Sequence, residues 1–249
     1  MLKNFSTIKK AYTLVELSIV LVIISIFLSS GLNIFTNNIV QTKTVNTKEK
    51  LNIIYKSLAE YLMTNQALPC PINLNIPKDT DTSYGATSLG SIDNCVANTI
   101  GTFPNQIIIG ALPTRDLGLT SDMAEDDFGN KILYVVDNRL ITNFVATGFS
   151  DGAIDIGQGS GSNTPTKPVL LLLSFGANSC GSYKTNGQKN NDCTEQNDGS
   201  GQFKNSDNDT TFATSDTNPK FDDVVLTKTY YDFLQELNLT HTQSQAYFR

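Results

Sequence analysis

The N-terminal stretch Lys9–Phe27, KKAYTLVELSIVLVIISIF, constrains the fold of this chain more than any other segment. Basic residues lie only before its apolar run, and none follows until Lys43. Residues 12–32 provide about 20 residues, which is enough for a helix to cross a bilayer. The charge asymmetry predicts a cytoplasmic N-terminus, with the rest of the chain on the other side of the membrane.

Three interpretations of this segment compete. It is a secretory signal peptide cleaved near Ser29–Gly31, a plain membrane anchor, or a short leader that is removed so that the apolar helix is retained. The single acid, Glu16, favours the third interpretation. A charged side chain in a membrane segment costs about 2.5–3.5 kcal/mol, and a signal peptide or an anchor gains nothing from that cost. An acid is useful there only if a positive partner reaches it.

The same residues resemble the leader and N-terminal helix of type IV pilins and type II secretion pseudopilins. In that family a basic leader ends in a small residue, usually glycine. An aromatic residue, usually phenylalanine, follows, and then a Thr-Leu-Val/Ile-Glu motif and a long apolar run. Here Ala11 is the small residue, Tyr12 is the aromatic residue, and Thr13–Glu16 is the motif.

The resemblance implies that prepilin peptidase cuts between Ala11 and Tyr12 and that Tyr12 is then N-methylated. Cleavage creates a cationic amine one helical turn from Glu16. In the family this acid neutralises the N-terminal amine of an adjacent subunit during assembly. Pairing makes an otherwise costly charge tolerable in apolar surroundings.

The helical signal continues beyond the apolar run. Large apolar residues such as Leu51, Ile54 and Leu58 recur every three or four positions and predict a helix that packs one face on a core. The expected domains are a leader at 1–11, a helix at 12–63 whose transmembrane and assembly part is 12–32, and a globular head at 64–249.

Strands are expected in the head after an irregular connecting loop at 70–110. The segments Pro69–Pro71, Gly110–Leu119 and Asp127–Asn130 resemble those that introduce the sheet in a subset of pilin-like proteins. We interpret Asp127–Asn130 as a tight turn. The predicted strands are Lys131–Val136, Leu140–Ala146, Ala153–Ile156, Val169–Phe175 and Val224–Thr227, followed by a short C-terminal helix or tail.

The four cysteines form no C-x-x-C motif, and their even number beside an export-like N-terminus indicates disulfides. Pairing between sequence neighbours gives Cys70–Cys95 and Cys180–Cys193. Each bond closes a polar segment and contributes about 3 kcal/mol by chain-entropy reasoning. Four buried free thiols are the alternative.

The composition of the sequence argues against several classes of function. A net charge of -6 argues against a nucleic-acid partner, and a single histidine argues against a histidine-rich metal site or a His-dependent triad. No catalytic residues emerge, so we expect no enzyme and no cofactor. Asp198, Asp207 and Asp222 are weak calcium candidates in an acidic C-terminal loop, for which a solvated loop is the simpler interpretation.

The sequence as a whole predicts an α+β, pilin-like fold. Its long N-terminal helix, membrane-spanning in the first half, packs on a small antiparallel sheet with disulfide-stapled loops. The expected function is that of a structural subunit of a type IV pilus or type II secretion pseudopilus. Its partners would be prepilin peptidase, other pilin or pseudopilin subunits, the inner membrane and the assembly platform.

The expected location is a single-pass inner-membrane protein with its head in the periplasm, or a cell-surface fibre once assembled into a pilus. Two alternatives remain. One is a minor or competence pseudopilin that primes or tips the fibre, and the other is a membrane-anchored periplasmic enzyme.

Overall fold

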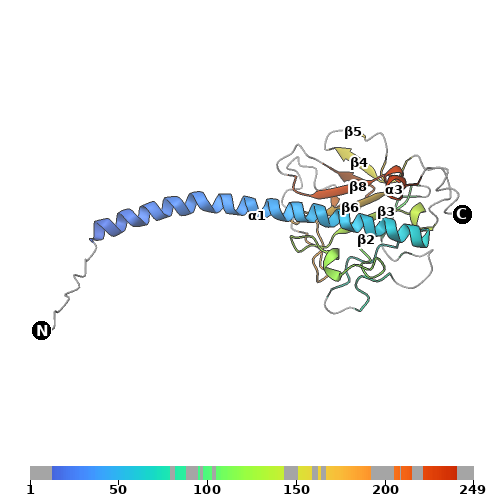
Figure 1. Ribbon diagram of the computed structural model, residues 1–249, viewed down its shortest axis with the longest axis horizontal. Coiled ribbons are helices and arrows are strands. Elements are labelled where there is room, and N and C mark those ends of the chain that lie inside the picture. The colour runs from blue at the N-terminus through green and yellow to red at the C-terminus, as the bar shows by residue number, and fades with distance from the viewer. Residues whose placement is uncertain are drawn as a thin grey trace. The chain divides into compact units, whose positions relative to one another are not determined.

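One long helix, α1 (Leu14–Asn65, 52 residues), dominates the computed structural model (Figure 1). The chain divides into two compact units, Met1–Thr42 and Lys43–Arg249, and α1 contributes residues to both. The structure describes residues 13–78, 82–87, 95, 98–102, 105–142, 151–158, 162–163, 167–191, 205–207, 209–214 and 221–239, without the side chains of 27–36, 98, 142, 158, 162 and 163.

The end of α1 is set by local backbone geometry. Gln66 adopts a left-handed conformation with φ 59°, and its N–H donates to the Leu62 carbonyl at 2.8 Å. A residue in this conformation is a common helix stop, although glycine usually supplies it. The chain then turns toward the sheet region, where the Leu68 N–H donates to the Leu140 carbonyl at 2.8 Å.

Two sheets form the described β part of the C-terminal unit. The larger sheet has the order β1-β2-β3-β6-β8, and every neighbouring pair is antiparallel. Its strands are β1 (Asn98–Ile100), β2 (Ile107–Ala111), β3 (Leu133–Asp137), β6 (Leu170–Ser174) and β8 (Val224–Lys228). The smaller sheet has the order β5-β4-β7 and includes a parallel β4–β7 pair; its strands are β4 (Asp155–Gln158), β5 (Ser162–Asn163) and β7 (Thr211–Ala213).

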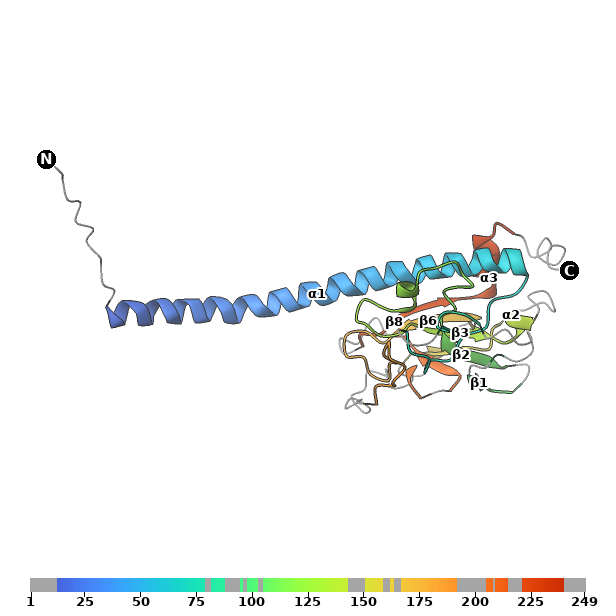
Figure 2. The ribbon, with the colours of Figure 1, turned by 90° about the horizontal axis from the view of Figure 1, so that it is seen from below.

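Within the C-terminal unit, α1 lies over one face of the large sheet, as Figure 2 shows. Alternate residues of each strand point to opposite faces, so two cores result. Toward α1 lie residues such as Ile108, Tyr134 and Leu172, together with Leu51, Ile54 and Leu58 of the helix. Toward the other face lie residues such as Val135 and Leu173, together with Ile156 and Phe212 of the small sheet. Because β6 is buried on both faces, its first four residues, 170–173, are all leucine.

Three short helices complete the described elements: η1 (Ser121–Ala124), α2 (Arg139–Thr142) and α3 (Tyr230–Glu236). A capping box starts α3, in which the Thr229 and Asp232 side chains each accept a hydrogen bond from the other's backbone N–H. Phe233 of α3 packs edge-on against Tyr55 of α1, with ring centroids 5.2 Å apart. This contact ties α3 to the helical layer.

The prediction that residues 12–32 span a membrane is wrong for the part of the chain that the structure describes. No helix there is both long and apolar enough to cross a bilayer. The single-pass inner-membrane location with a periplasmic head is corrected on this ground.

The expected fold class is corrected as well. That fold class included a long helix whose first half crosses the membrane, and no membrane-spanning helix is found in the described chain. The described chain also holds a second sheet with a parallel β4–β7 pair, rather than one small antiparallel sheet. Strands that are far apart in the sequence pair to form this second sheet, so a local sequence pattern does not predict it.

Two local predictions also fail. The strand expected at Leu140–Ala146 is wrong for its described part, because residues 140–142 belong to the helix α2 (Arg139–Thr142); residues 143–150 lie outside the described chain. Asp137 starts that helical turn by accepting a hydrogen bond from the Arg139 N–H at 3.0 Å. The loop expected at 70–110 contains β1 and the start of β2, which pair with one another and place Ile107–Ala111 beside β3.

The tight turn predicted at Asp127–Asn130 is confirmed. Gly129 has φ 87°, and its N–H donates to the Asp126 carbonyl at 3.2 Å. The Asp126 carboxylate accepts hydrogen bonds from the Phe128 and Asn130 N–H groups at 3.0 and 2.8 Å. A short acidic side chain that binds the backbone two residues on is typical of such turns.

Candidate functional site

The start of α1 is fixed by Thr13. The Thr13 hydroxyl accepts a hydrogen bond from the Glu16 N–H at 3.3 Å, and the Thr13 carbonyl accepts one from the Leu17 N–H at 3.1 Å. Thr13 is therefore the N-cap of the helix, and Glu16 is at the third helical position. Sequence reasoning missed this cap, although the T-x-x-E spacing at Thr13–Glu16 was a signal for it.

Glu16 thus has two properties in the structure. It is exposed, and it lies in the first turn, where a negative charge interacts favourably with the helix dipole. Helix capping alone explains an acid at this position. A capping role does not explain why the acid is followed immediately by a long apolar surface.

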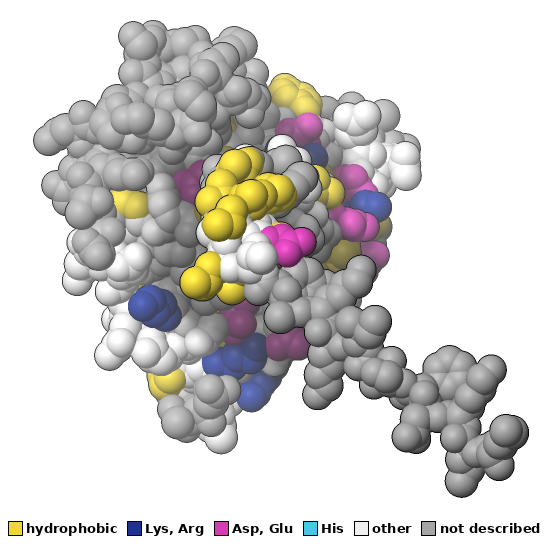
Figure 3. Space-filling model, turned by 90° about the vertical axis from the view of Figure 1, so that its left-hand side faces the viewer, with side chains coloured by type: hydrophobic (Ala, Val, Ile, Leu, Met, Phe, Trp, Pro, Cys, Tyr) yellow, Lys and Arg dark blue, Asp and Glu magenta, His cyan; other side chains and the backbone are white. Residues whose placement is uncertain are grey.

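That apolar surface covers the described start of α1. Large apolar side chains there are at least 46% exposed: Leu14, Val15, Leu17, Ile19, Val20, Leu21, Val22, Ile23, Ile24 and Ile26. Figure 3, which looks along α1 from its N-terminal side, shows hydrophobic side chains gathered at this end. We call residues 14–26 the apolar segment. A helix that is apolar around its whole circumference is normally buried, so a contiguous surface of this kind marks an interaction site.

The predicted processing site lies outside the described residues, which begin at Thr13. Ala11 and Tyr12 were expected to flank the cut, and Tyr12 was expected to be methylated. Their roles remain predictions.

The Cys70–Cys95 disulfide is confirmed, with a Cα–Cα distance of 5.6 Å across a sequence separation of 25. Cys180 is also disulfide-bonded, whereas its expected partner, Cys193, lies outside the described residues. The first bond joins the end of the helical layer to the segment before β1. Both of its cysteines pack against the core between α1 and the large sheet.

The weak calcium candidates are not brought together in the described chain. Asp198 lies outside it, and the Asp222 carboxylate accepts a hydrogen bond from the Asn178 N–H at 2.8 Å. Asp207 is half-buried. Among the described residues, no three acidic, cysteine or histidine side chains cluster as a metal site would require.

A buried acid, Asp223, directly follows the candidate Asp222 in the chain. Asp223 Oδ2 accepts a hydrogen bond from Asn205 Nδ2 at 2.7 Å, and Asn205 also donates to the Ala213 carbonyl at 3.2 Å. Burial raises the pKa of Asp223 to about 8, and the Asn205 hydrogen bond offsets only part of that shift. The side chain is consequently a largely neutral acid at neutral pH, which suits a structural role.

Comparisons with known proteins find no match to this chain, whether among protein-family models, curated proteins or solved structures.

Proposed function

We propose that the chain is a structural subunit of a type IV pilus or type II secretion pseudopilus, and that copies associate through the N-terminal part of α1. The observation that carries this proposal is the apolar segment, which exposes its large side chains and holds one carboxylate, Glu16, in its first turn.

Burial of the apolar segment between copies supplies the driving force. Full burial of a Val, Leu or Ile side chain contributes about 1.5–3 kcal/mol. Several such side chains together match the cost of about 4–15 kcal/mol for lost translational and rotational freedom. Helices that pack side by side would shield these side chains from water.

The carboxylate would then set the register between copies. Once water is excluded, a carboxylate without a cation nearby is strongly unfavourable. Cleavage before Tyr12 would supply a cation, the new α-amine, at the start of the same helix. Glu16 of one copy and this amine of another would meet at only one offset of the two helices along their axes. The pair would therefore select that offset over others.

Processing is the first test of the proposal. Mass spectrometry of the protein purified from its native host should show a chain that begins at Tyr12 and carries one methyl group on its amine. A mature terminus near Gly31 would instead establish the secretory-signal interpretation. An uncut, unmethylated chain would reject the pilin-type processing altogether.

A further inference from the structure

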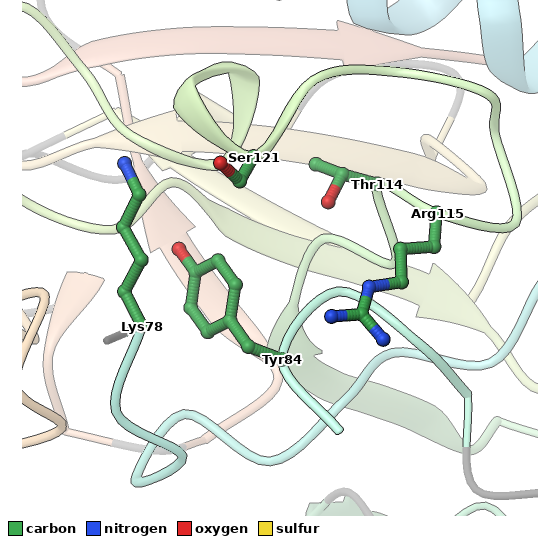
Figure 4. Close-up of a pocket in the computed structure, with 5 residues that line it drawn as sticks. All are labelled: Lys78, Tyr84, Thr114, Arg115 and Ser121. Carbon is green, nitrogen blue, oxygen red and sulfur yellow. The ribbon is translucent and has the colours of Figure 1, made fainter. Parts of the chain in front are cut away.

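A polar cavity of about 500 Å³ opens on the C-terminal unit (Figure 4). Its lining residues are Lys78, Tyr84, Thr114, Arg115 and Ser121, each of which carries a hydrogen-bonding group. Sites for small molecules commonly have volumes of about 300–1,000 Å³, but most are lined by apolar side chains. The composition of this cavity therefore indicates a strongly hydrophilic ligand.

The walls of the cavity are held in place by contacts between separate loops. Lys78 Nζ is 2.6 Å from Asp122 Oδ1 and 2.8 Å from Glu125 Oε1. The Arg115 N–H donates to the Gly85 carbonyl at 2.7 Å. These contacts join Lys78 and residues 82–85 to the segment 114–125. The cavity thus has a defined shape before any ligand arrives.

Two buried side chains, Tyr84 and Lys131, lie beneath the cavity. Tyr84 is only 4% exposed, and Lys131 Nζ lies 5.3 Å from the centroid of its ring. Lys131 also donates hydrogen bonds to the Leu74 and Ile76 carbonyls, which fixes the chain just before Lys78. One ring face of Tyr84 is occupied by Lys131, and its hydroxyl donates a long hydrogen bond to Glu125 Oε1 at 3.4 Å, so this hydroxyl would meet a ligand as an acceptor.

The two cations of the cavity differ in how their charge is balanced. Burial lowers the pKa of Lys78, but its pairing with Asp122 and Glu125 outweighs burial and raises the pKa above the usual range. Arg115 is exposed and donates from Nη1 to the Thr82 carbonyl. Across the part of the chain that the structure describes, no carboxylate forms an ion pair with Arg115. The guanidinium therefore retains donors for an external anion.

Hydroxyl groups face the same space. Figure 4 shows the Thr114 hydroxyl directed into the space beside Arg115, and the Tyr84 and Ser121 hydroxyls directed toward the side of Lys78. Hydroxyls both donate and accept hydrogen bonds, so they match the hydroxyls of a ligand as well as its anionic oxygens. A planar guanidinium fork matches a carboxylate through two parallel hydrogen bonds.

We propose that this cavity binds a small, hydroxylated carboxylate, of which a hexuronate, the acidic unit of many polysaccharides, is the simplest example. The carboxylate lies on Arg115, and the ligand hydroxyls bond to Thr114, Ser121 and Tyr84. The proposal concerns the C-terminal unit alone and does not depend on how copies of the chain assemble.

The test is a titration of the full-length chain with glucuronate, followed by NMR chemical shifts of the protein. The chain is kept in a non-ionic detergent without a sugar head group, so that the detergent does not compete. Glucose presents the hydroxyls alone, and sulfate presents the anion alone. Glucuronate is expected to bind at least tenfold more tightly than either. Equal binding of sulfate and glucuronate would overturn the proposal, as would no binding of glucuronate at millimolar concentration.

Variants then locate the site. Arg115→Gln is expected to weaken glucuronate binding at least tenfold, and Thr114→Val, which preserves side-chain volume, is expected to weaken it severalfold. Lys48→Gln is the matched control, because Lys48 is an exposed cation of α1 that does not line the cavity, and it should leave binding unchanged. An Arg115→Gln chain with wild-type affinity, or an equal loss in Lys48→Gln, would show that any binding is elsewhere.

Discussion

The Ser174 hydroxyl donates a hydrogen bond to Asp126 Oδ2 at 2.6 Å, and this bond joins the last residue of β6 to the turn that precedes β3. The other oxygen of Asp126 accepts from two backbone N–H groups of the same turn. One buried carboxylate therefore satisfies three donors. Burial raises the pKa of Asp126, while these hydrogen bonds lower it in part.

Asp126→Ala should lower the free energy of unfolding by about 3 kcal/mol or more, because buried donors left without an acceptor cost about 1–3 kcal/mol each. Ser174→Ala removes one donor to Asp126 and the acceptor of a longer hydrogen bond from the Gly176 N–H at 3.3 Å, and it should cost about 1–2 kcal/mol. Urea denaturation measures both, and Asp151→Ala is the control for loss of an exposed carboxylate. If Asp126→Ala were no more destabilising than Asp151→Ala, the network would have no role in stability.

Asp223 predicts an unusual dependence of stability on pH. Its pKa is about 8 in the folded chain, above the ordinary value of 3.8. Between these values the unfolded chain has lost the proton that the folded chain retains, so stability falls as pH rises from about 4 to about 8. The fall due to this residue should be on the order of a few kcal/mol.

Asp223→Asn should remove that part of the pH dependence, because an amide does not ionise and still accepts the hydrogen bond from Asn205. The variant should therefore match the wild type near pH 4 and be the more stable protein near pH 8. Thermal unfolding at both pH values measures the difference. Parallel pH profiles for the two proteins would contradict the assignment.

The Cys70–Cys95 bond should stabilise the chain by about 3 kcal/mol, because it closes a loop with a sequence separation of 25. A Cys70→Ser, Cys95→Ser double variant tests this bond while Cys180 remains oxidised. Its urea midpoint should fall relative to the wild type. An unchanged midpoint would mean that the loop is fixed by its packing alone.

Substitutions at Glu16 separate two explanations of this acid, helix capping and pairing with the amine of a neighbouring copy. Glu16→Gln removes the charge but keeps a polar side chain that can accept a hydrogen bond at the helix start. Glu16→Val removes the charge and the hydrogen-bonding group. If Glu16 pairs with the amine of a neighbouring copy, both variants should lose crosslinking between copies to a similar extent. Processing before Tyr12 should be unaffected in both.

Helix content by circular dichroism and crosslinking in cells are measured on the same variants. Glu49→Gln is the control, because Glu49 is an exposed acid further along α1. Normal crosslinking by Glu16→Gln, together with reduced crosslinking by Glu16→Val, would assign Glu16 to helix capping and would contradict the pairing hypothesis.

The amino-acid sequence by itself determined the elements whose hydrogen bonds are local. It predicted a helix at 12–63, and the structure has one at Leu14–Asn65, because helical hydrogen bonds join residues four apart and the apolar spacing repeats with that period. It also located the Asp127–Asn130 turn, and it located β3, β6 and β8 to within two residues. The Cys70–Cys95 bond followed from the order of the cysteines.

Only the tertiary structure decided what depends on residues distant in the sequence. Strand β2 had apolar residues but no alternation, and its pairing with β3 identifies it as a strand. The parallel contact of β4 with β7, the Asn205–Asp223 bond and the cavity around Arg115 each join separate segments. The physical reason is that strand pairing and cavity walls are made by non-local contacts, whose partners the local pattern of a sequence does not specify.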